Sequence, residues 1–188
     1  MNLPNKLTLF RVILIPVMVI LSYFFKDNIV FHTVSLSNLW VLFVFVVAAF
    51  TDFLDGYIAR KHNMVTTLGK FMDPLADKLL VLAGLIILLE ANAIYGWAVI
   101  MILAREFMVT GIRLLAVEDN VVIAASKLGK AKTVSQMLMV ILLLLGNYPF
   151  DLINIPMGTI FIYIATALTV VSGIDYFIKN KHVIFKSK

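Results

Sequence analysis

The chain has no cysteine among its 188 residues. Disulfide bonds, thiolate metal sites and cysteine nucleophiles are therefore excluded, and the sequence does not indicate a redox compartment. Charged residues are also scarce, at 14% of the total, and no repeat of fixed period or low-complexity tract is present. These absences leave little room for a soluble domain or for a thiol-based chemistry.

Most of the sequence is apolar. Hydrophobic residues make up 62% of it and the mean hydropathy is +1.00, far above the values of a soluble domain of this length. A helix that spans a bilayer needs about 20 apolar residues. The first long run has no small-residue cleavage site, so a cleaved signal is not expected. We expect an all-α integral membrane protein, one domain over residues 1–188, with six transmembrane helices near residues 7–25, 38–58, 74–93, 94–116, 132–149 and 156–178.

The basic residues suggest an orientation in the membrane. A net charge of +5 would be compatible with nucleic-acid binding, but the positions of the basic residues along the chain favour another explanation. The loops that follow the first, third and fifth apolar runs contain a single lysine or arginine, Lys26. The positive-inside rule then predicts a multi-pass protein of the cell membrane with both termini in the cytoplasm, whose lysines meet lipid headgroups and no nucleic acid. The eleven basic residues on the predicted cytoplasmic side are Lys6, Arg60, Lys61, Lys70, Lys127, Lys130, Lys132, Lys179, Lys181, Lys186 and Lys188.

Four aspartates interrupt the hydrocarbon within the segment DFLDGYIARKHNMVTTLGKFMDPLAD, residues 52–77. Two of them, Asp52 and Asp55, are three residues apart, and a glycine and an alanine continue the same helical face. Along a helix Asp52 would lie roughly 12 Å deeper than Arg60. This face therefore carries carboxylates below the cytoplasmic surface.

The other two aspartates, Asp73 and Asp77, are four residues apart and share a face of the following helix. Pro74 suits the first turn of that helix, with Asp73 as its N-cap. Both acidic faces lie at the cytoplasmic ends of neighbouring helices. We therefore expect the four carboxylates to converge in a polar cavity that faces the cytoplasm.

Carboxylates that share one cavity need compensating charge, because like charges in close contact disfavour ionisation. Two divalent cations would supply that charge, and oxygen ligands suit Mg²⁺ or Mn²⁺. The small residues leave room for a ligand beside the backbone, and Arg60 would offer a fork for a diphosphate. An alternative is that the aspartates simply pair with nearby cations, although acidic groups inside a membrane are usually functional. The candidate pairing partners are Arg60, Lys61, Lys70 and Lys78.

The acidic segment matches, position for position, the signature D-x2-D-G-x2-A-R-x8-G-x3-D-x3-D of the CDP-alcohol phosphotransferases, a family that the chain resembles. Eight fixed positions at fixed gaps make this match specific. Three further segments resemble the members of that family that use glycerol 3-phosphate as the acceptor. These are NLPNKLTLFRVILIP at 2–16, AREFMVTGIR at 104–113 and GKAKT at 129–133.

The resemblance implies a two-metal site and assigns roles to individual residues. Asp77 would be the catalytic base as well as a metal ligand. Homodimers are typical of the family. The ligands of two Mg²⁺ or Mn²⁺ ions would be Asp52, Asp55, Asp73 and Asp77. The residues that hold CDP-diacylglycerol would be Asn5, Thr8, Gly56, Arg60, Thr66 and Gly69.

The implied reaction transfers the phosphatidyl group of CDP-diacylglycerol to sn-glycerol 3-phosphate. Its products are phosphatidylglycerol phosphate and CMP, a step of phospholipid biosynthesis. Such a transfer needs a neutralised diphosphate and an aligned hydroxyl. No Ser–His or Cys–His pairing suggests a covalent intermediate, so we favour single displacement, and an aspartyl intermediate stays open.

The acceptor brings a second phosphate, which needs cations of its own. Two arginines lie within the fourth apolar run and two lysines open the fifth. The alternatives are that an arginine pairs with Glu106 or an aspartate, and that Lys132 anchors lipid headgroups. The residues expected to bind glycerol 3-phosphate are Arg11, Arg105, Arg113, Lys130 and Lys132.

Two other functions stay open. Another member of the family, inositol-phosphate or cardiolipin-forming, would use a different acceptor, and a neutral acceptor would not need the arginines of the fourth run. A cation-coupled transporter would also carry membrane aspartates. Transporter sites, however, usually lie at the midplane between repeats, whereas these aspartates are expected near one surface.

Overall fold

The computed structural model is all-helical apart from one short hairpin, which confirms the helical class expected from the sequence. It describes residues 3–24, 29–31, 34–61, 67–118, 123 and 126–181, with side chains omitted at 3, 4, 31, 53, 55–57, 59–61, 67–71, 117 and 118. The described elements are α1 (Leu3–Phe24), β1 (Ile29–Phe31), β2 (Val34–Ser35), α2 (Leu36–Lys61), α3 (Thr67–Glu90), α4 (Gly96–Glu118), α5 (Lys127–Leu144), the 3-10 helix η1 (Phe150–Ile153) and α6 (Met157–Lys179).

Each of the six helices overlaps one of the six apolar runs, but α3 begins earlier than expected, and α5 begins and ends five residues earlier than its expected run, 132–149. The prediction that Asp73 caps this helix and Pro74 opens it is wrong, because the helix starts at Thr67 and contains Pro74 in its interior. Proline lacks the N–H that would bond to the carbonyl of Lys70, so one backbone hydrogen bond is lost. The helix continues through it, as α1 does through Pro16.

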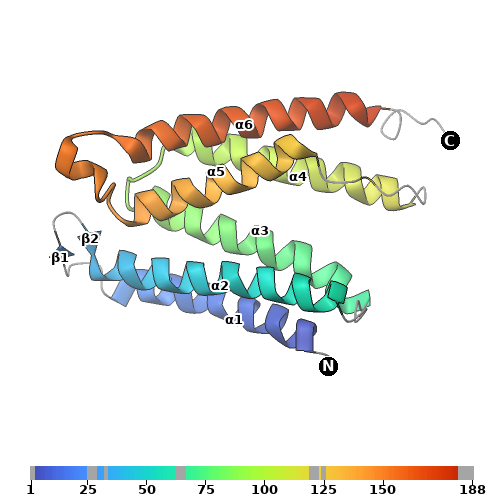
Figure 1. The fold of residues 1–188 in the computed structure, drawn as a ribbon, viewed down its shortest axis with the longest axis horizontal. Helices are drawn as coiled ribbons and strands as arrows, with labels where there is room; N and C mark the ends of the chain where they lie inside the picture. The colour runs from blue at the N-terminus through green and yellow to red at the C-terminus, as the bar shows by residue number, and fades with distance from the viewer. Residues whose placement is uncertain are drawn as a thin grey trace. The chain divides into compact units, whose positions relative to one another are not determined.

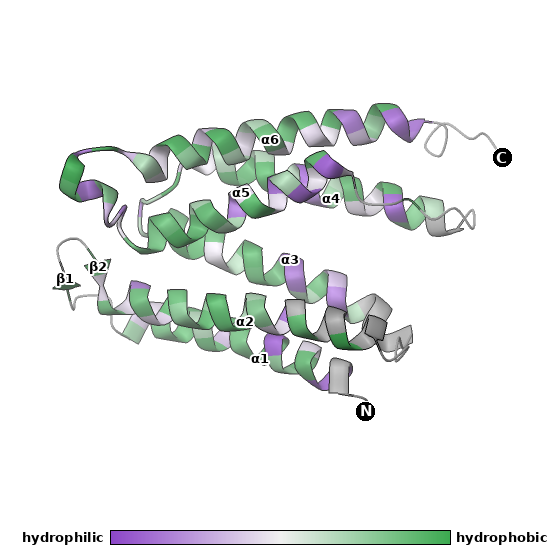
Figure 2. Cartoon of the chain, in the orientation of Figure 1, coloured by the Kyte–Doolittle hydropathy of each residue, from purple (hydrophilic) through white to green (hydrophobic). Residues whose placement is uncertain are grey.

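Two helices in the described part of the chain are long and apolar enough, by length and composition, to cross a membrane. They are Asn5–Phe24 within α1 and Met157–Lys179, and α2 has a shorter apolar section, Leu36–Asp52. Only 17% of the apolar window of α1 is buried within the molecule, against 39% for α6. Figure 2 shows the hydrophobic colour along most of both helices, with the hydrophilic residues of α6 near its C-terminal end. These two helices suggest membrane association, and the other four spans remain predictions.

A first compact unit comprises residues 1–91 with 144–146 and contains α1, α2, α3 and the hairpin. In this unit α1 and α2 lie side by side in opposite directions, and α3 packs against both (Figure 1). The antiparallel strands β1 and β2, where Phe31 pairs with Val34, were not predicted. The alternation of direction brings the start of α1, the end of α2 and the start of α3 to the same end of the unit.

Residues 92–143 and 147–188 form a second compact unit with α4, α5 and α6. Here α4 packs against α6 around a buried cluster of Val109, Ile112 and Tyr176. Helix α5 is joined to α6 by a buried hydrogen bond of 3.2 Å from Gln136 Nε2 to Thr169 Oγ1. The two units are described separately, and the expectation of one transmembrane domain stays a prediction.

Candidate active site

The signature aspartates meet a buried arginine in the first unit. Arg11 Nη1 lies 2.7 Å from Asp77 Oδ1 and 2.9 Å from Asp52 Oδ1. The Arg11 side chain is 0% exposed, whereas the two aspartate side chains are 46% and 40% exposed. One guanidinium nitrogen therefore links carboxylates from α2 and α3, and it approaches them from the buried side.

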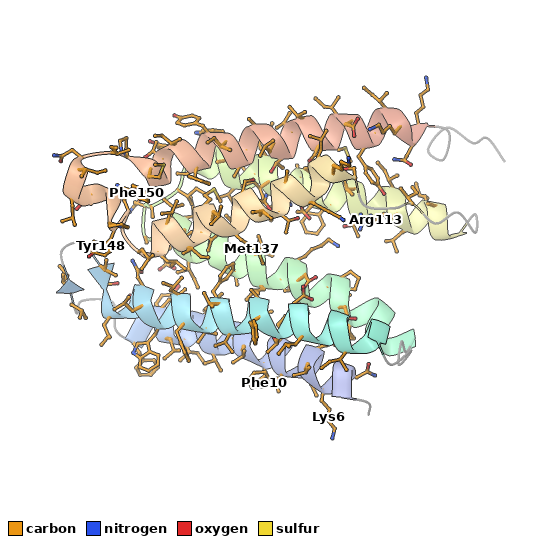
Figure 3. All side chains as sticks on the ribbon, viewed as in Figure 1. Lys6, Phe10, Arg113, Met137, Tyr148 and Phe150 are labelled. Atoms are coloured by element: carbon orange, nitrogen blue, oxygen red, sulfur yellow. The ribbon has the colours of Figure 1, made fainter. Side chains whose placement is uncertain are left out.

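A third aspartate joins this cluster through a threonine. Thr8 Oγ1 donates a 2.6 Å hydrogen bond to Asp73 Oδ1. Asn5, Thr8 and Arg11 are spaced three residues apart on α1 and all three are buried. In contrast, Lys6 and Phe10 point outward from α1 (Figure 3). The polar face of α1 is thus turned towards the ends of α2 and α3 that carry the acidic signature.

The donor chemistry of this cluster suits a hard divalent cation, since the described carboxylates outnumber the one guanidinium and offer oxygen ligands. Among the described side chains, however, no group of three acidic residues stands in a metal-binding arrangement. Asp55, the fourth signature aspartate, lies outside the described side chains, and Arg11 stands beside Asp52 and Asp77. The residues fit such a metal in chemistry, with Arg11 as a cation already in place.

The remaining signature residues lie at the same end of the unit but outside the described side chains. Asp55, Gly56 and Arg60 belong to the last turns of α2, and Gly69 belongs to the first turn of α3. Thr66 lies outside the described residues. The predicted metal-ligand role of Asp55 and the predicted CDP-binding roles of the other four stay predictions.

A second charged cluster lies in the second unit and is centred on Glu106. Arg105 Nη1 donates a 3.2 Å hydrogen bond to Glu106 Oε1, and Lys132 Nζ pairs with the same oxygen. The Arg105 and Lys132 side chains are only 11% and 5% exposed. The alternative that Arg105 pairs with Glu106 is therefore observed. Lys132 is buried, so it does not stand at the surface where headgroup anchors lie.

The other predicted acceptor residues do not share the Glu106 pairing. The Arg113 Nε donates a 3.2 Å hydrogen bond to the hydroxyl of Tyr176, and its guanidinium carbon lies 5.8 Å from the centre of that ring. Lys130 is exposed. Arg11 belongs to the aspartate cluster of the first unit. The structure thus pairs two of the five predicted residues through one carboxylate and gives the others different neighbours.

Glycine allows Arg105 to lie close against α6. A Cβ atom at Gly173 would stand 2.9 Å from Arg105 Cγ, closer than such contacts occur. At the start of α5, Ser126 Oγ accepts a 3.0 Å hydrogen bond from the backbone N–H of Gly129, and a Cβ at Gly129 would lie 3.8 Å from Arg105 Nη2. The absence of a side chain at Gly173 therefore gives Arg105 of α4 the space to lie this close to α6.

Two residues of the second unit that contact predicted acceptor residues, Glu106 and Tyr176, were not among the predicted site residues. The sequence predicts Glu106 only as a possible partner of an arginine and predicts no role for Tyr176. The available signal for Tyr176 is that a buried tyrosine usually places its hydroxyl against a hydrogen-bond partner. For Glu106, the signal is a carboxylate next to an arginine inside an apolar helix.

Comparison with known proteins agrees with the signature. Residues 1–171 match the family of CDP-alcohol phosphatidyltransferases, and the match extends into α6. The chain therefore belongs to the CDP-alcohol phosphatidyltransferase family, which confirms the resemblance.

Relatives that carry one functional name cover almost the whole chain. A Bacillus subtilis protein named CDP-diacylglycerol--glycerol-3-phosphate 3-phosphatidyltransferase is 46% identical over 183 residues, covering 95% of each chain. A Rickettsia typhi protein of the same name is 42% identical, covering 94% of this chain and 95% of its own. A Haemophilus influenzae protein, again of that name, is 37% identical, with 93% and 91% covered.

Proposed function

We propose that this chain is an enzyme that transfers the phosphatidyl group of CDP-diacylglycerol to sn-glycerol 3-phosphate, giving phosphatidylglycerol phosphate and CMP. Family membership and the shared name of relatives up to 46% identical support this reaction. The structural observation that carries it is the aspartate cluster. Asp52, Asp73 and Asp77, from two helices, meet the polar face of α1 at one end of the first unit.

The metal site is proposed from the signature and from the chemistry of its donors. Asp52, Asp55, Asp73 and Asp77 would hold two ions, Mg²⁺ or Mn²⁺. When bound, such ions neutralise a diphosphate and stabilise negative charge on a departing phosphate oxygen. The exposure of 40% and 46% for the side chains of Asp52 and Asp77 supports access from solvent or membrane surface.

The residues of the chain orient the reactants and move one proton. Asp77 accepts the proton of the 1-hydroxyl of glycerol 3-phosphate. The hydroxyl oxygen then forms a bond to the phosphorus of the phosphatidyl group, and the bond from that phosphorus to the CMP oxygen breaks. Thr8 holds Asp73, and Arg11 holds Asp52 and Asp77, so the carboxylates keep fixed positions. Asn5, Gly56, Arg60, Thr66 and Gly69 complete the proposed site for the CDP moiety.

The acceptor phosphate is proposed to bind at the second charged cluster. Arg105 and Lys132 carry two positive charges against the single negative charge of Glu106, so the trio keeps one positive charge. The Nε of Arg105 is buried and has no hydrogen-bond partner among the described residues, which leaves a donor for an anion. Arg113 and the exposed Lys130 are proposed as further contacts. The described neighbours of Arg11 favour a role at the aspartates instead.

A multi-pass arrangement with six spans and cytoplasmic termini is proposed for the membrane, and a homodimer for the assembly. The eleven basic residues on one side support the orientation. In the second unit Tyr95 stacks on Trp97 with ring centres 6.1 Å apart, and Tyr163 lies 5.8 Å from Trp97. These rings are about half exposed, near the start of α4, away from its charged residues. An aromatic group of this kind suits the membrane–water interface on the opposite side.

Release of CMP from CDP-diacylglycerol by the purified protein tests the proposal. Glycerol 3-phosphate should be the acceptor that supports turnover, when compared with inositol phosphate and phosphatidylglycerol. Turnover with one of the other two acceptors alone would assign a different member of the family. Cation flux across vesicles without CMP release would point instead to a transporter.

A further inference from the structure

We propose that Arg11 is a built-in counter-cation of the aspartate site, which holds the carboxylates together without metal and weakens metal binding by competing for them. The inference rests on the proposed metal site. It adds a positioning role for a residue of α1 that lies outside the acidic signature. The carrying observation is that one nitrogen, Arg11 Nη1, contacts oxygens of both Asp52 and Asp77.

The burial of the three side chains indicates that Arg11 needs the aspartates more than they need it. Arg11 is 0% exposed, so its charge sits within the unit and needs the two carboxylates as compensation. The carboxylates are nearly half exposed and can meet a further cation from their open side. A divalent ion can thus reach Asp52 and Asp77 while Arg11 stays behind them.

Competition follows from the shared oxygen atoms. Arg11 Nη1 already donates a charged hydrogen bond of 2.7 Å to Asp77 Oδ1 and forms an ion pair of 2.9 Å with Asp52 Oδ1. An ion that coordinates these carboxylates must weaken those bonds and remain beside a buried positive charge. Removing the charge at position 11 should therefore tighten metal binding, by about tenfold on the usual strength of a charged hydrogen bond. It should also destabilise the metal-free protein, because the two carboxylates then lose the buried cation that both of them contact.

Binding of Mn²⁺ alone to the purified full-length protein in detergent tests this, with free Mn²⁺ counted by electron paramagnetic resonance. Arg11→Gln should lower the Kd for Mn²⁺ about tenfold. It should also lower the Tm measured in EDTA. Addition of Mn²⁺ should then raise the Tm of the variant by more than it raises the Tm of the wild type. Lys6→Gln is the matched control, since it removes one charge from an exposed position of the same helix and should leave the Kd within about twofold.

Two further variants complete the test. Arg11→Lys keeps the positive charge, so its Kd for Mn²⁺ should lie closer to that of the wild type than the Kd of Arg11→Gln does. If Arg11→Gln does not fold, Arg11→Met removes the charge without leaving a buried amide and should show the same lowered Kd. Unchanged or weaker Mn²⁺ binding in the variants without the charge overturns this inference alone. Equal Mn²⁺ binding by the wild type and Asp77→Asn overturns the proposed metal site and this inference with it.

Discussion

Two lysines at the start of α5 offer a sharp test of the acceptor site. Lys130 and Lys132 lie two residues apart, carry the same charge and differ in surroundings. Lys130 is exposed, whereas the Lys132 side chain is 5% exposed and shares a carboxylate oxygen with Arg105. Replacement of each lysine by glutamine removes the same charge from two different environments.

The expected effects differ because burial controls screening. Lys132→Gln removes the one excess positive charge of the cluster and leaves Glu106 to neutralise Arg105 fully. A charged hydrogen bond contributes about 1.5–3 kcal/mol, so the KM for glycerol 3-phosphate should rise about 10- to 100-fold. Lys130→Gln should change it by less than about threefold, since exposed charges interact weakly through solvent.

Initial rates of CMP release, with each substrate varied in turn, measure both effects. The KM for CDP-diacylglycerol should stay nearly constant in both variants. KM reports binding if chemistry is slow relative to substrate release, so single-turnover rates should accompany it. The reasoning is refuted if Lys132→Gln binds glycerol 3-phosphate normally and loses affinity for the lipid substrate. It is also refuted if the two lysine variants behave alike.

Three other outcomes follow from the structure. EDTA should abolish CMP release, and Mg²⁺ or Mn²⁺ should restore it. Asp52→Asn should lower turnover by more than about 100-fold while the protein still inserts into the membrane, because even the hydrogen-bond partners of metal ligands contribute about 10- to 100-fold. Metal-independent turnover by the wild type would exclude the metal site. Gly173→Ala should lower stability by about 1–3 kcal/mol and raise the KM for glycerol 3-phosphate, because the added Cβ displaces Arg105. Gly111→Ala is the control: no atom lies within 4 Å of its added Cβ, so it should raise stability by about 0.5–1 kcal/mol. Equal Tm changes for the two variants would contradict the close approach of Arg105 to Gly173. Because the chain has no cysteine, single introduced cysteines can report the orientation. Met64→Cys and Leu128→Cys should react with impermeant reagents only from the cytoplasmic side, and Phe150→Cys only from the outside. Labelling of Met64→Cys from the outside would overturn the predicted orientation.

The helices could be predicted because long apolar runs determine them almost alone. Residue spacing also predicted that Asp73 and Asp77 share a helical face, and both meet the polar side chains of α1. The start of α3 could not be predicted in the same way. A proline near polar residues is a sound signal for a helix start, yet the loss of one hydrogen bond at Pro74 did not end the helix.

The partner of each charge was the part that the sequence could not supply. Arg11 is separated by 41 and 66 positions from Asp52 and Asp77, so no local pattern links them. Only the packing of α1 against α2 and α3 does so. For Arg105 the sequence left the neighbouring Glu106 open as one possible partner, but the contact of Lys132 with the same carboxylate depends on the packing of another helix.

The sparse burial of α1 has a consequence for how that helix finds its position. In lipid, apolar side chains gain little by leaving acyl chains for another helix, so a hydrophobic surface alone does not fix the rotation or the axial register of α1. Its polar contacts do: a slide by one turn, about 5.4 Å, would separate Thr8 from Asp73 and Arg11 from both carboxylates. The chemical groups proposed to serve the reaction therefore also set the alignment of the helix that carries them.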